Sequence, residues 1–312
     1  MKELLKRLAG RPAPSPTPAP GESGGDGLNH VDLCFVVDTT GSMSPFIDAA
    51  RGALLDTVGA LGAKGGVDLR VGLVEYRDHP PQESTFVTRH HALTADLGRM
   101  QKVIGGLRAD GGGDAPEAVY DGVSEAALLA DWRAHSCRFI LLVGDAPPHG
   151  YVARAASPEA AQEGPARRRG GARASGGARA RGPETCLCGL DASRTTAAAE
   201  EARVTVHALP MQDDVATFGA FAELARATGG ACAPPAGAEQ VVARIGEMLD
   251  AEFGELGLDR EVLEAARRLG SQEAGEIAGL LGRTRLQAAR SLARLGRRGF
   301  LRSFEGAVLT TA

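Results

Sequence analysis

Three oxygen-bearing side chains at alternate positions follow an apolar stretch near the beginning of the chain. The segment VVDTTGSMSPF (36–46) places Asp38, Thr40 and Ser42 where a predicted strand ends. Carboxylate and hydroxyl oxygens at this spacing favour one of two roles. They could cap the helix that the following residues predict, or they could hold Mg²⁺ or Mn²⁺, which prefer oxygen ligands.

Two later segments present further acidic residues in predicted loops. The glycine-rich segment DGGGDAPEAVYDG (110–122) opens a helix, and LLVGDAPPHG (141–150) contains the end of a strand. If the three segments meet, their carboxylates repel one another unless a proton or a cation neutralises them. The sequence therefore predicts a Mg²⁺ or Mn²⁺ site. Its candidate residues are Asp38, Thr40, Ser42, Asp114, Glu117 and Asp145.

Alternating strand and helix patterns predict the scaffold that would bring these segments together. Apolar strand patterns occupy 31–37, 67–76, 137–145 and 203–211, and a more polar pattern at 84–93 is predicted at a sheet edge. Helical patterns lie at about 44–62, 95–106, 116–130, 216–228 and 238–252. This order predicts a doubly wound α/β domain with a mainly parallel sheet. The loops after parallel strands then share one edge of that sheet.

Segments of other composition flank and interrupt this domain, which is predicted over 31–252. Residues 1–30 are expected to form a short helix and a Pro- and Gly-rich linker. Residues 152–185 include ARRRGGARASGGARARG (166–182), which has six arginines and no acid. We expect a disordered surface insertion there, with nucleic-acid contact as the alternative.

Residues 256–312 are predicted to form a second unit. Three helical patterns, DREVLEAARRL, SQEAGEIAGLLG and RTRLQAARSLARLGRRGFL, precede a short strand and turn in FLRSFEGAVLTT. In the third pattern, apolar residues recur at three-residue spacing at Leu286, Ala289, Leu292 and Leu295. Three helices and a hairpin predict a winged helix-turn-helix arrangement.

This second unit is rich in arginine. Seven arginines and no acid lie between residues 283 and 302, on the expected recognition element. Such a run predicts contact with DNA phosphates, and the candidate residues are Arg283, Arg285, Arg290 and Arg294. Winged helices also act as protein-docking units or dimer interfaces, so this alternative stays open.

The motifs DTTGSM, GGGDAPEA and LLVGDAPPHG together resemble the von Willebrand factor type A (VWA) family with its metal-ion-dependent adhesion site. The resemblance implies that Thr40 and Ser42 ligate the metal directly and that Asp38 acts through water. In the second motif, many members use a threonine, whereas Asp114 and Glu117 look like the integrin β-type loop, in which the glutamate reaches the metal. The third motif maps onto Asp145, which the resemblance implies holds the metal-binding side chains in place without binding the metal directly.

The resemblance also implies a function. It suggests a non-enzymatic adaptor whose metal binds an Asp or Glu of a protein partner, and a MoxR-like AAA+ ATPase is one candidate partner by family analogy. A transcription regulator that binds DNA through the C-terminal unit is an alternative. A metal-dependent phosphohydrolase is another, although Thr40 stands where an aspartate-nucleophile phosphatase would need a second aspartate as general acid.

Composition and net charge limit the class of protein and the compartment that we expect. A net charge of −4 over 312 residues argues against one large nucleic-acid clamp. Five cysteines at irregular spacing indicate a reducing compartment rather than a disulfide framework. The charged start MKELLKRLAG and the lack of an apolar run of about 18 residues point to a cytoplasmic protein. Cys186 and Cys188 are predicted to be solvent-facing thiols, with a zinc site that includes His149 as the alternative.

Overall fold

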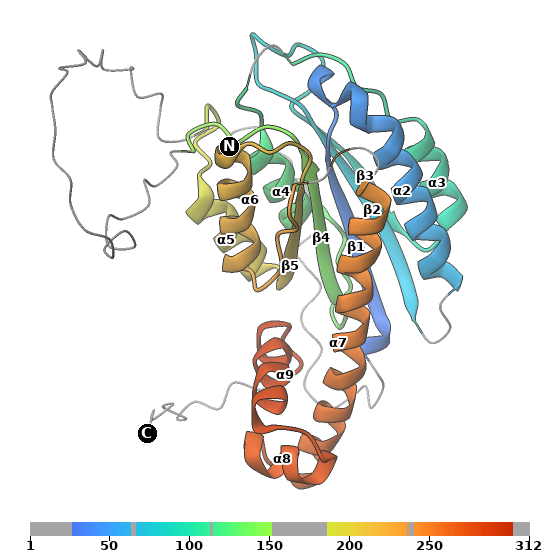
Figure 1. The fold of residues 1–312 in the computed structure, drawn as a ribbon, viewed down its shortest axis with the longest axis vertical. Helices are drawn as coiled ribbons and strands as arrows, with labels where there is room; N and C mark the ends of the chain where they lie inside the picture. Colours follow the sequence, from blue (N-terminus) through green and yellow to red (C-terminus); the bar gives the residue numbers. More distant parts are fainter. Residues whose placement is uncertain are drawn as a thin grey trace, which may run out of the picture.

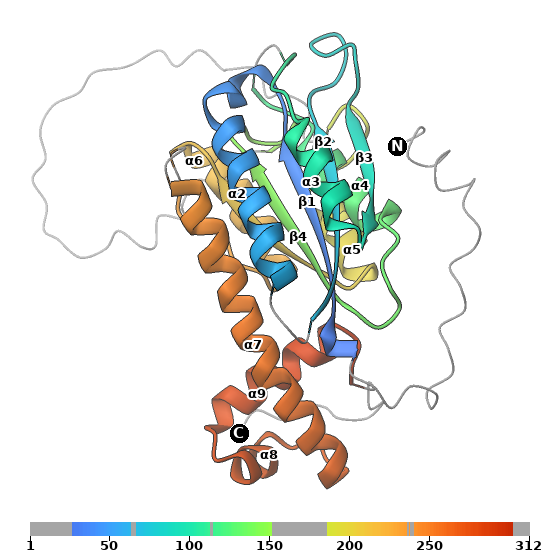
Figure 2. The same ribbon diagram turned by 90° about the vertical axis from the view of Figure 1, so that its right-hand side faces the viewer.

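The fold is a five-stranded sheet covered by helices on both faces, with two further helices at one end (Figures 1 and 2). It was obtained as a computed structural model, which describes residues 27–63, 67–112, 115–151, 186–235, 237 and 240–301. The predicted N-terminal helix and linker lie almost wholly outside these ranges, and the predicted arginine-rich insertion lies wholly outside them.

The sheet has the predicted character. Four strands are parallel, and the edge strand β3 is antiparallel to its neighbour, so the sheet is mixed but mainly parallel. The strand order is β3-β2-β1-β4-β5. The strands are β1 (His30–Asp38), β2 (Asp68–Tyr76), β3 (Thr88–Thr94), β4 (Cys137–Gly144) and β5 (Val204–Pro210).

Strand β1 is buried on both faces, which explains its continuous apolar sequence. Phe35 and Val37 join the core on one side of the sheet, and Cys34 and Val36 join the core on the other. Successive side chains of a strand point to opposite faces, so a central strand needs apolar residues at every position. The carboxyl end of β1, at Asp38, therefore lies between two packed layers of side chains.

Three helices cover each face of the sheet. The first core is covered by α2 (Ser44–Ala63), α3 (Leu97–Gly105) and α7 (Val241–Leu269), and the second by α4 (Val119–Leu129), α5 (Ala192–Glu201) and α6 (Val215–Ala227). Two short 3₁₀ turns, η1 (Gly27–Asn29) and η2 (Gly41–Met43), precede β1 and α2. Helix α5 was not predicted. It begins at Asp191, whose side chain accepts a hydrogen bond from the backbone N–H of Arg194.

Helix α7 continues without a break through the boundary that was expected between 252 and 256. It leads into α8 (Ala274–Leu281) and α9 (Arg285–Arg297). Leu256 and Val262 on α7 and Leu295 on α9 belong to the same buried cluster as the sheet residues of the α7 face. The strand and turn expected after residue 301 lie outside the described residues, so the winged helix stays a prediction.

The buried face of α9 agrees only in part with the predicted three-residue row, in which Leu295 is buried and Leu292 is half-buried. Leu286 is 59% exposed and Ala289 is exposed, whereas Ala288, Ser291 and Leu295 are fully buried. Residues three apart rotate by about 60° per step around a helix of 3.6 residues per turn, so such a row leaves the core within a few steps. The observed positions follow the i, i+3, i+7 pattern of one helical face.

A buried polar cluster holds α9 against α7. Asp259 of α7 is fully buried and accepts hydrogen bonds from Ser291 Oγ (2.6 Å), Arg294 Nη2 (2.6 Å) and Arg298 Nη1 (3.1 Å). Arg294 also pairs with Glu255. Because a buried charge needs partners, this cluster fixes which face of α9 turns inward.

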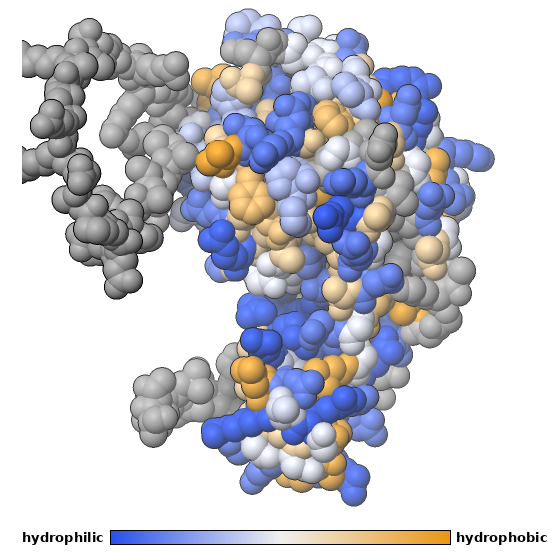
Figure 3. Space-filling model, viewed as in Figure 1, coloured by the Kyte–Doolittle hydropathy of each residue, from blue (hydrophilic) through white to orange (hydrophobic). Residues whose placement is uncertain are grey.

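The same cluster reaches the sheet. Arg298 donates to Glu252 (2.7 Å), which also lies 3.2 Å from His207 Nε2 of β5. The Arg298 guanidinium stands 5.1 Å from the ring centre of Phe139 in β4. Figure 3 shows a hollow between the α/β body and the α8–α9 pair, and a pocket of about 240 Å³ between these parts includes Arg203 in its lining. None of the helices in the described ranges has the length and apolar character needed to cross a membrane.

Candidate functional site

The first predicted loop follows β1 as a compact turn in which one of the two carboxylate oxygens of Asp38 makes no hydrogen bond to a described residue. Asp38 is fully buried, and its Oδ1 accepts hydrogen bonds from the backbone N–H of Thr40 (2.8 Å) and from Thr40 Oγ1 (2.7 Å). Its Oδ2 has no hydrogen-bond partner among the described residues. Thr40, at the N-cap of η2, makes no side-chain capping bond. Helix capping therefore does not account for this arrangement.

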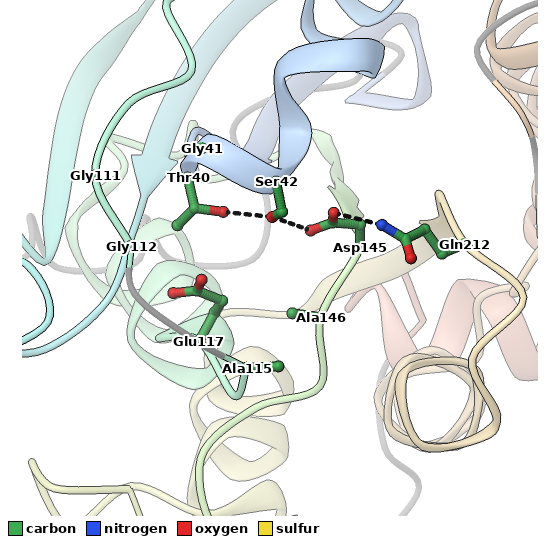
Figure 4. Close-up of a pocket in the computed structure, with 10 residues that line it drawn as sticks. All are labelled: Thr40, Gly41, Ser42, Gly111, Gly112, Ala115, Glu117, Asp145, Ala146 and Gln212. Atoms are coloured by element: carbon green, nitrogen blue, oxygen red, sulfur yellow. Dashed lines mark hydrogen bonds between the residues drawn. The ribbon is translucent and has the colours of Figure 1, made fainter.

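The third predicted loop meets the first. Thr40 Oγ1 lies 3.1 Å from Ser42 Oγ, and Ser42 Oγ donates to Asp145 Oδ1 at 3.0 Å. Gln212, just after β5, donates to Asp145 Oδ2 at 2.9 Å. Figure 4 shows this chain of polar groups running across the pocket. The loops after β1, β4 and β5 are adjacent because these strands are neighbours in the sheet, so Gln212 follows from the strand order.

The second loop approaches the first through glycine. Glu117 is 4% exposed, and its Oε2 has no partner among the described residues. Gly112 has φ +70°, and a Cβ there would lie 2.9 Å from Thr40 Cβ and 3.1 Å from Glu117 Oε1. Glycine is thus required both by backbone conformation and by space. Asp114, the other predicted residue of this loop, lies outside the described residues.

Backbone hydrogen bonds tie the three loops together. The Gly41 N–H donates to the Gly111 carbonyl (2.9 Å), which joins the first and second loops. The Glu117 N–H donates to the Pro147 carbonyl (2.9 Å), and the His149 N–H donates to the Glu117 carbonyl (3.2 Å), which joins the second and third. The oxygen-bearing side chains are therefore held on a connected backbone frame.

The pocket between these loops concentrates negative charge. Burial, with the charge of Asp145, raises the pKa of Asp38 to about 7. Burial, with the charges of Asp38, Asp78 and Asp145, raises the pKa of Glu117 to about 9. Burial also raises the pKa of Asp145. Each carboxylate thus resists ionisation next to the others, as expected where a neutralising charge has yet to be supplied.

The donor set fits a hard divalent cation. The pocket has a volume of about 460 Å³, and its described lining includes no lysine or arginine. Hydroxyl and carboxylate oxygens face it, and two buried carboxylate oxygens, Asp38 Oδ2 and Glu117 Oε2, have no partner in the part of the chain that the structure describes. Mg²⁺ and Mn²⁺ prefer such oxygens. Five of the six predicted residues are brought together here, and the sixth is Asp114.

A second group of metal-type ligands was anticipated from the sequence only in part, since Cys186 and Cys188 belong to it but His79 and Asp121 were not considered. His79, Asp121, Cys186 and Cys188 each offer one ligand atom, and these atoms lie within 4.8 Å of one another. Cys186 is 3% exposed, so the expectation of a solvent-facing thiol was wrong for this residue. His149, the predicted zinc partner, instead pairs with Asp78. The Cys-x-Cys spacing was the only signal of this group that the sequence carried.

The arginines predicted to bind DNA have acidic neighbours. Arg294 is held by Asp259 and Glu255, Arg283 pairs with Glu261 at 3.0 Å, and Arg285 lies 3.6 Å from Glu273. Arg290 is exposed. The acids come from α7 and from the start of α8, outside the stretch that looked uniformly basic in sequence.

Comparison with known proteins finds matches to the first part of the α/β region. A family model described as von Willebrand factor A domain matches residues 32–156. The alpha-protein kinase vwkA of Dictyostelium discoideum is 31% identical over 121 residues, which are 38% of this chain and 19% of the kinase. A putative ariadne-like RING finger protein of Acanthamoeba polyphaga mimivirus is 32% identical over 119 residues, 38% of this chain and 11% of that protein. The chain thus matches only a small part of either relative.

Solved structures resemble the fold at low sequence identity. The pilus adhesin SpaC from Lactobacillus rhamnosus GG aligns with a TM-score of 0.45 and 18% identity, covering 70% of this chain and 29% of SpaC. The protein BatB from Bacteroides thetaiotaomicron aligns with a TM-score of 0.44 and 12% identity, covering 70% of this chain and 99% of BatB. The family match over residues 32–156 supports a von Willebrand factor A domain in that part of the chain.

Proposed function

We propose that the chain is a metal-dependent protein-binding module. Mg²⁺ or Mn²⁺ would be held at the carboxyl end of the sheet by the hydroxyls of Thr40 and Ser42 and by Glu117. The carboxylates of Asp38 and Asp145 would supply further negative charge close to the ion. The open side of the pocket would accept an Asp or Glu side chain of a partner protein, and the bound ion would supply the positive charge that attracts it.

One observation carries this proposal. The buried oxygens Asp38 Oδ2 and Glu117 Oε2 lack hydrogen-bond partners among the described residues, yet both belong to the loops that line one pocket. A buried polar atom without a partner destabilises a fold, and a buried charge does so more strongly. A cation between the loops would satisfy Glu117 Oε2, which lines the pocket, and would offset the mutual repulsion of the carboxylates, that of Asp38 included.

Binding fits the residues better than hydrolysis. The hydroxyl of Thr40 donates to Asp38, and a threonine hydroxyl is too weak an acid to protonate a leaving group near neutral pH. Two neutral hydroxyl ligands would leave the ion strongly electrophilic, which favours capture of an external carboxylate. We therefore propose no catalytic step, and a MoxR-like AAA+ ATPase remains a candidate partner to test.

Paired peptides test the function directly. The full chain is applied to an array in which each peptide with Asp or Glu has a twin with Asn or Gln. Binding to the acidic members in Mg²⁺ or Mn²⁺, and its loss in EDTA, is expected. The double variant Thr40→Ala, Ser42→Ala should lose binding. Ser44→Ala, which removes an exposed hydroxyl at the start of α2 outside the pocket, should retain it.

The array also separates the alternatives. Equal binding to the acidic and amide twins, or binding that EDTA leaves intact, would rule out carboxylate capture by a metal. Retention of binding by the Thr40→Ala, Ser42→Ala variant would show that these hydroxyls do not hold the ion. Circular dichroism of each variant confirms that the fold is kept.

A further inference from the structure

Four side chains from three separate parts of the chain converge beside the second face of the sheet. His79 comes from the loop after β2, Asp121 from the first turn of α4, and Cys186 and Cys188 from the segment before α5. His79 Nε2 lies 2.9 Å from Cys186 Sγ and 3.1 Å from Asp121 Oδ2. The same Asp121 oxygen lies 3.2 Å from Cys186 Sγ and 3.3 Å from Cys188 Sγ.

The two cysteines sit on a tight turn that aims them inward. The Cys186 N–H donates to the Leu190 carbonyl (2.8 Å), and the Gly189 N–H donates back to the Cys186 carbonyl (2.7 Å). Gly189 has φ +84°, a conformation that favours glycine. Leu187, between the cysteines, is 61% exposed, while Cys186 is 3% exposed. Hydrophobicity alone would bury the leucine, so the turn is organised around the thiols.

The cluster is enclosed, and its parts are fixed. The side chains of His79 and Asp121 are 9% and 14% exposed. Asp121 is held by helix α4, and His79 is held at its backbone, where its N–H donates to Asp78 Oδ1 at 2.6 Å. One oxygen of Asp121 is approached by three potential ligand atoms. Such convergence on a single point is more than a neutral hydrogen-bond network needs.

We propose that His79, Asp121, Cys186 and Cys188 bind one Zn²⁺ ion in a tetrahedral site. Two sulfurs, one imidazole nitrogen and one carboxylate oxygen form a four-ligand set suited to zinc. With bonds of about 2.0–2.3 Å, tetrahedral ligand atoms stand about 3.3–3.8 Å apart. The observed contacts of 2.9–3.3 Å would widen by less than about 1 Å around the ion.

This site differs in chemistry from the oxygen-lined pocket. Thiolates are soft ligands that favour Zn²⁺ over Mg²⁺, so the two sites would take different ions. Its position gives it a structural role. It would fix the segment that leads into α5 against α4, whose preceding loop carries Glu117. His79 also stacks edge-on against His149 of the third loop, with ring centres 5.5 Å apart.

Metal analysis of the full-length chain tests the proposal. The protein is purified under reducing conditions with Zn²⁺ in the growth medium, dialysed, and analysed for zinc by mass spectrometry. One equivalent of zinc per chain is expected. The double variant Cys186→Ser, Cys188→Ser should contain none, whereas Cys232→Ser, which alters a half-buried thiol outside the cluster, should keep the full equivalent.

Cobalt provides a second readout that does not depend on a variant folding well. The wild-type chain is stripped of metal and reconstituted with Co²⁺, which should give the ultraviolet sulfur-to-cobalt band and the intense visible bands of a tetrahedral thiolate site. Zn²⁺ should abolish these bands, and Mg²⁺ should not. The Thr40→Ala, Ser42→Ala variant should give the same spectrum, since it alters only the other site.

Three results would overturn the proposal. One is wild-type protein that carries no zinc and gives no thiolate–cobalt band after full reduction. Another is zinc that persists in the Cys186→Ser, Cys188→Ser variant. The third is a Cys186–Cys188 disulfide in the protein as isolated under reducing conditions. None of these results would affect the oxygen-lined pocket, so the two proposals stand or fall separately.

Discussion

Replacing Asp259 by asparagine should strongly destabilise the packing of α9 on α7. Asp259 is fully buried, and the side chains of its partners Arg294 and Arg298 are 14% and 3% exposed. The change keeps the shape of the side chain and removes its charge. Two guanidinium groups would then lie in the interior without their shared carboxylate.

The expected cost follows from this burial. Removing one partner of a buried ion pair costs about 3–5 kcal/mol, because the remaining charge stays buried and uncompensated. Arg294 and Arg298 each keep a second acid, Glu255 and Glu252, which places the expectation near about 3 kcal/mol. Against a total stability of about 5–15 kcal/mol for a domain, this is a large fraction.

Urea unfolding followed by circular dichroism measures the effect, with hydrogen exchange of α8 and α9 to locate it. The matched control is Glu261→Gln on the same helix, whose pair with Arg283 is about half exposed on both sides. An exposed pair contributes at most about 1 kcal/mol. Equal costs for the two variants would refute the reasoning, and Arg294 would then be available for phosphate contacts.

Mg²⁺ or Mn²⁺ should raise the melting temperature of the wild-type chain, measured by scanning fluorimetry, because a ligand that binds only the folded state stabilises it. The double variant Thr40→Ala, Ser42→Ala should show no such shift. A shift that persists in this variant would place the ion elsewhere. Gly112→Ala should cost about 1–3 kcal/mol, since φ is +70° and the new Cβ would meet Thr40. Gly246→Ala, where an added Cβ meets nothing within 4 Å, should stabilise α7 by up to about 1 kcal/mol in the same urea assay; the opposite ranking would contradict the loop geometry. Burial opposes ionisation of Glu252, but hydrogen bonds and charge interactions with His207 and Arg298 outweigh burial and lower the pKa from 4.5 to about 2. Its contribution is therefore complete above about pH 4.5 and is lost as pH falls through about 2, so the cost of Glu252→Gln should shrink from about 3 kcal/mol near neutral pH to about 1 kcal/mol near pH 3.

The candidate oxygen site was predictable because it depends on local patterns and one topological rule. The four parallel strands were predicted from their apolar residues, and parallel strands end at one edge of a sheet. That rule predicted that Ser42 and Asp145 lie close together, although they are 103 residues apart in sequence. In the structure, Ser42 Oγ lies 3.0 Å from Asp145 Oδ1. Gln212 was within reach of the same argument, since it also follows a strand, but an amide carries less chemical signal than a carboxylate.

The C-terminal helices were harder to predict because burial overrides local signals. The patterns at 238–252 and DREVLEAARRL were predicted as separate helices with Gly254 and Gly257 between them, yet α7 runs through both glycines. Leu249 and Leu256 are almost fully buried, and this packing outweighs the roughly 1 kcal/mol that each glycine costs in a helix. The inward face of α9 was also set by a distant charge, Asp259, which sequence periodicity does not record.

The sulfur-containing cluster shows a different limit. His79 and Asp121 lie 107 and 65 residues from Cys186. His79 stands in an irregular loop, and Asp121 reads as an ordinary acid in the first turn of a helix. Only the folded chain shows that they share one point in space.

The carboxyl ends of β1 and β4, where the loops of the oxygen-lined pocket begin, lie at the opposite end of the sheet from the α8–α9 pair (Figures 1 and 2). The nine residues of β1 separate these ends by about 30 Å at about 3.3 Å per residue. Helix α7, with 29 residues and a length of about 43 Å at about 1.5 Å per residue, continues past the sheet. In the described part of the chain, the two candidate binding regions are therefore far enough apart that one contact surface of ordinary size would not include both.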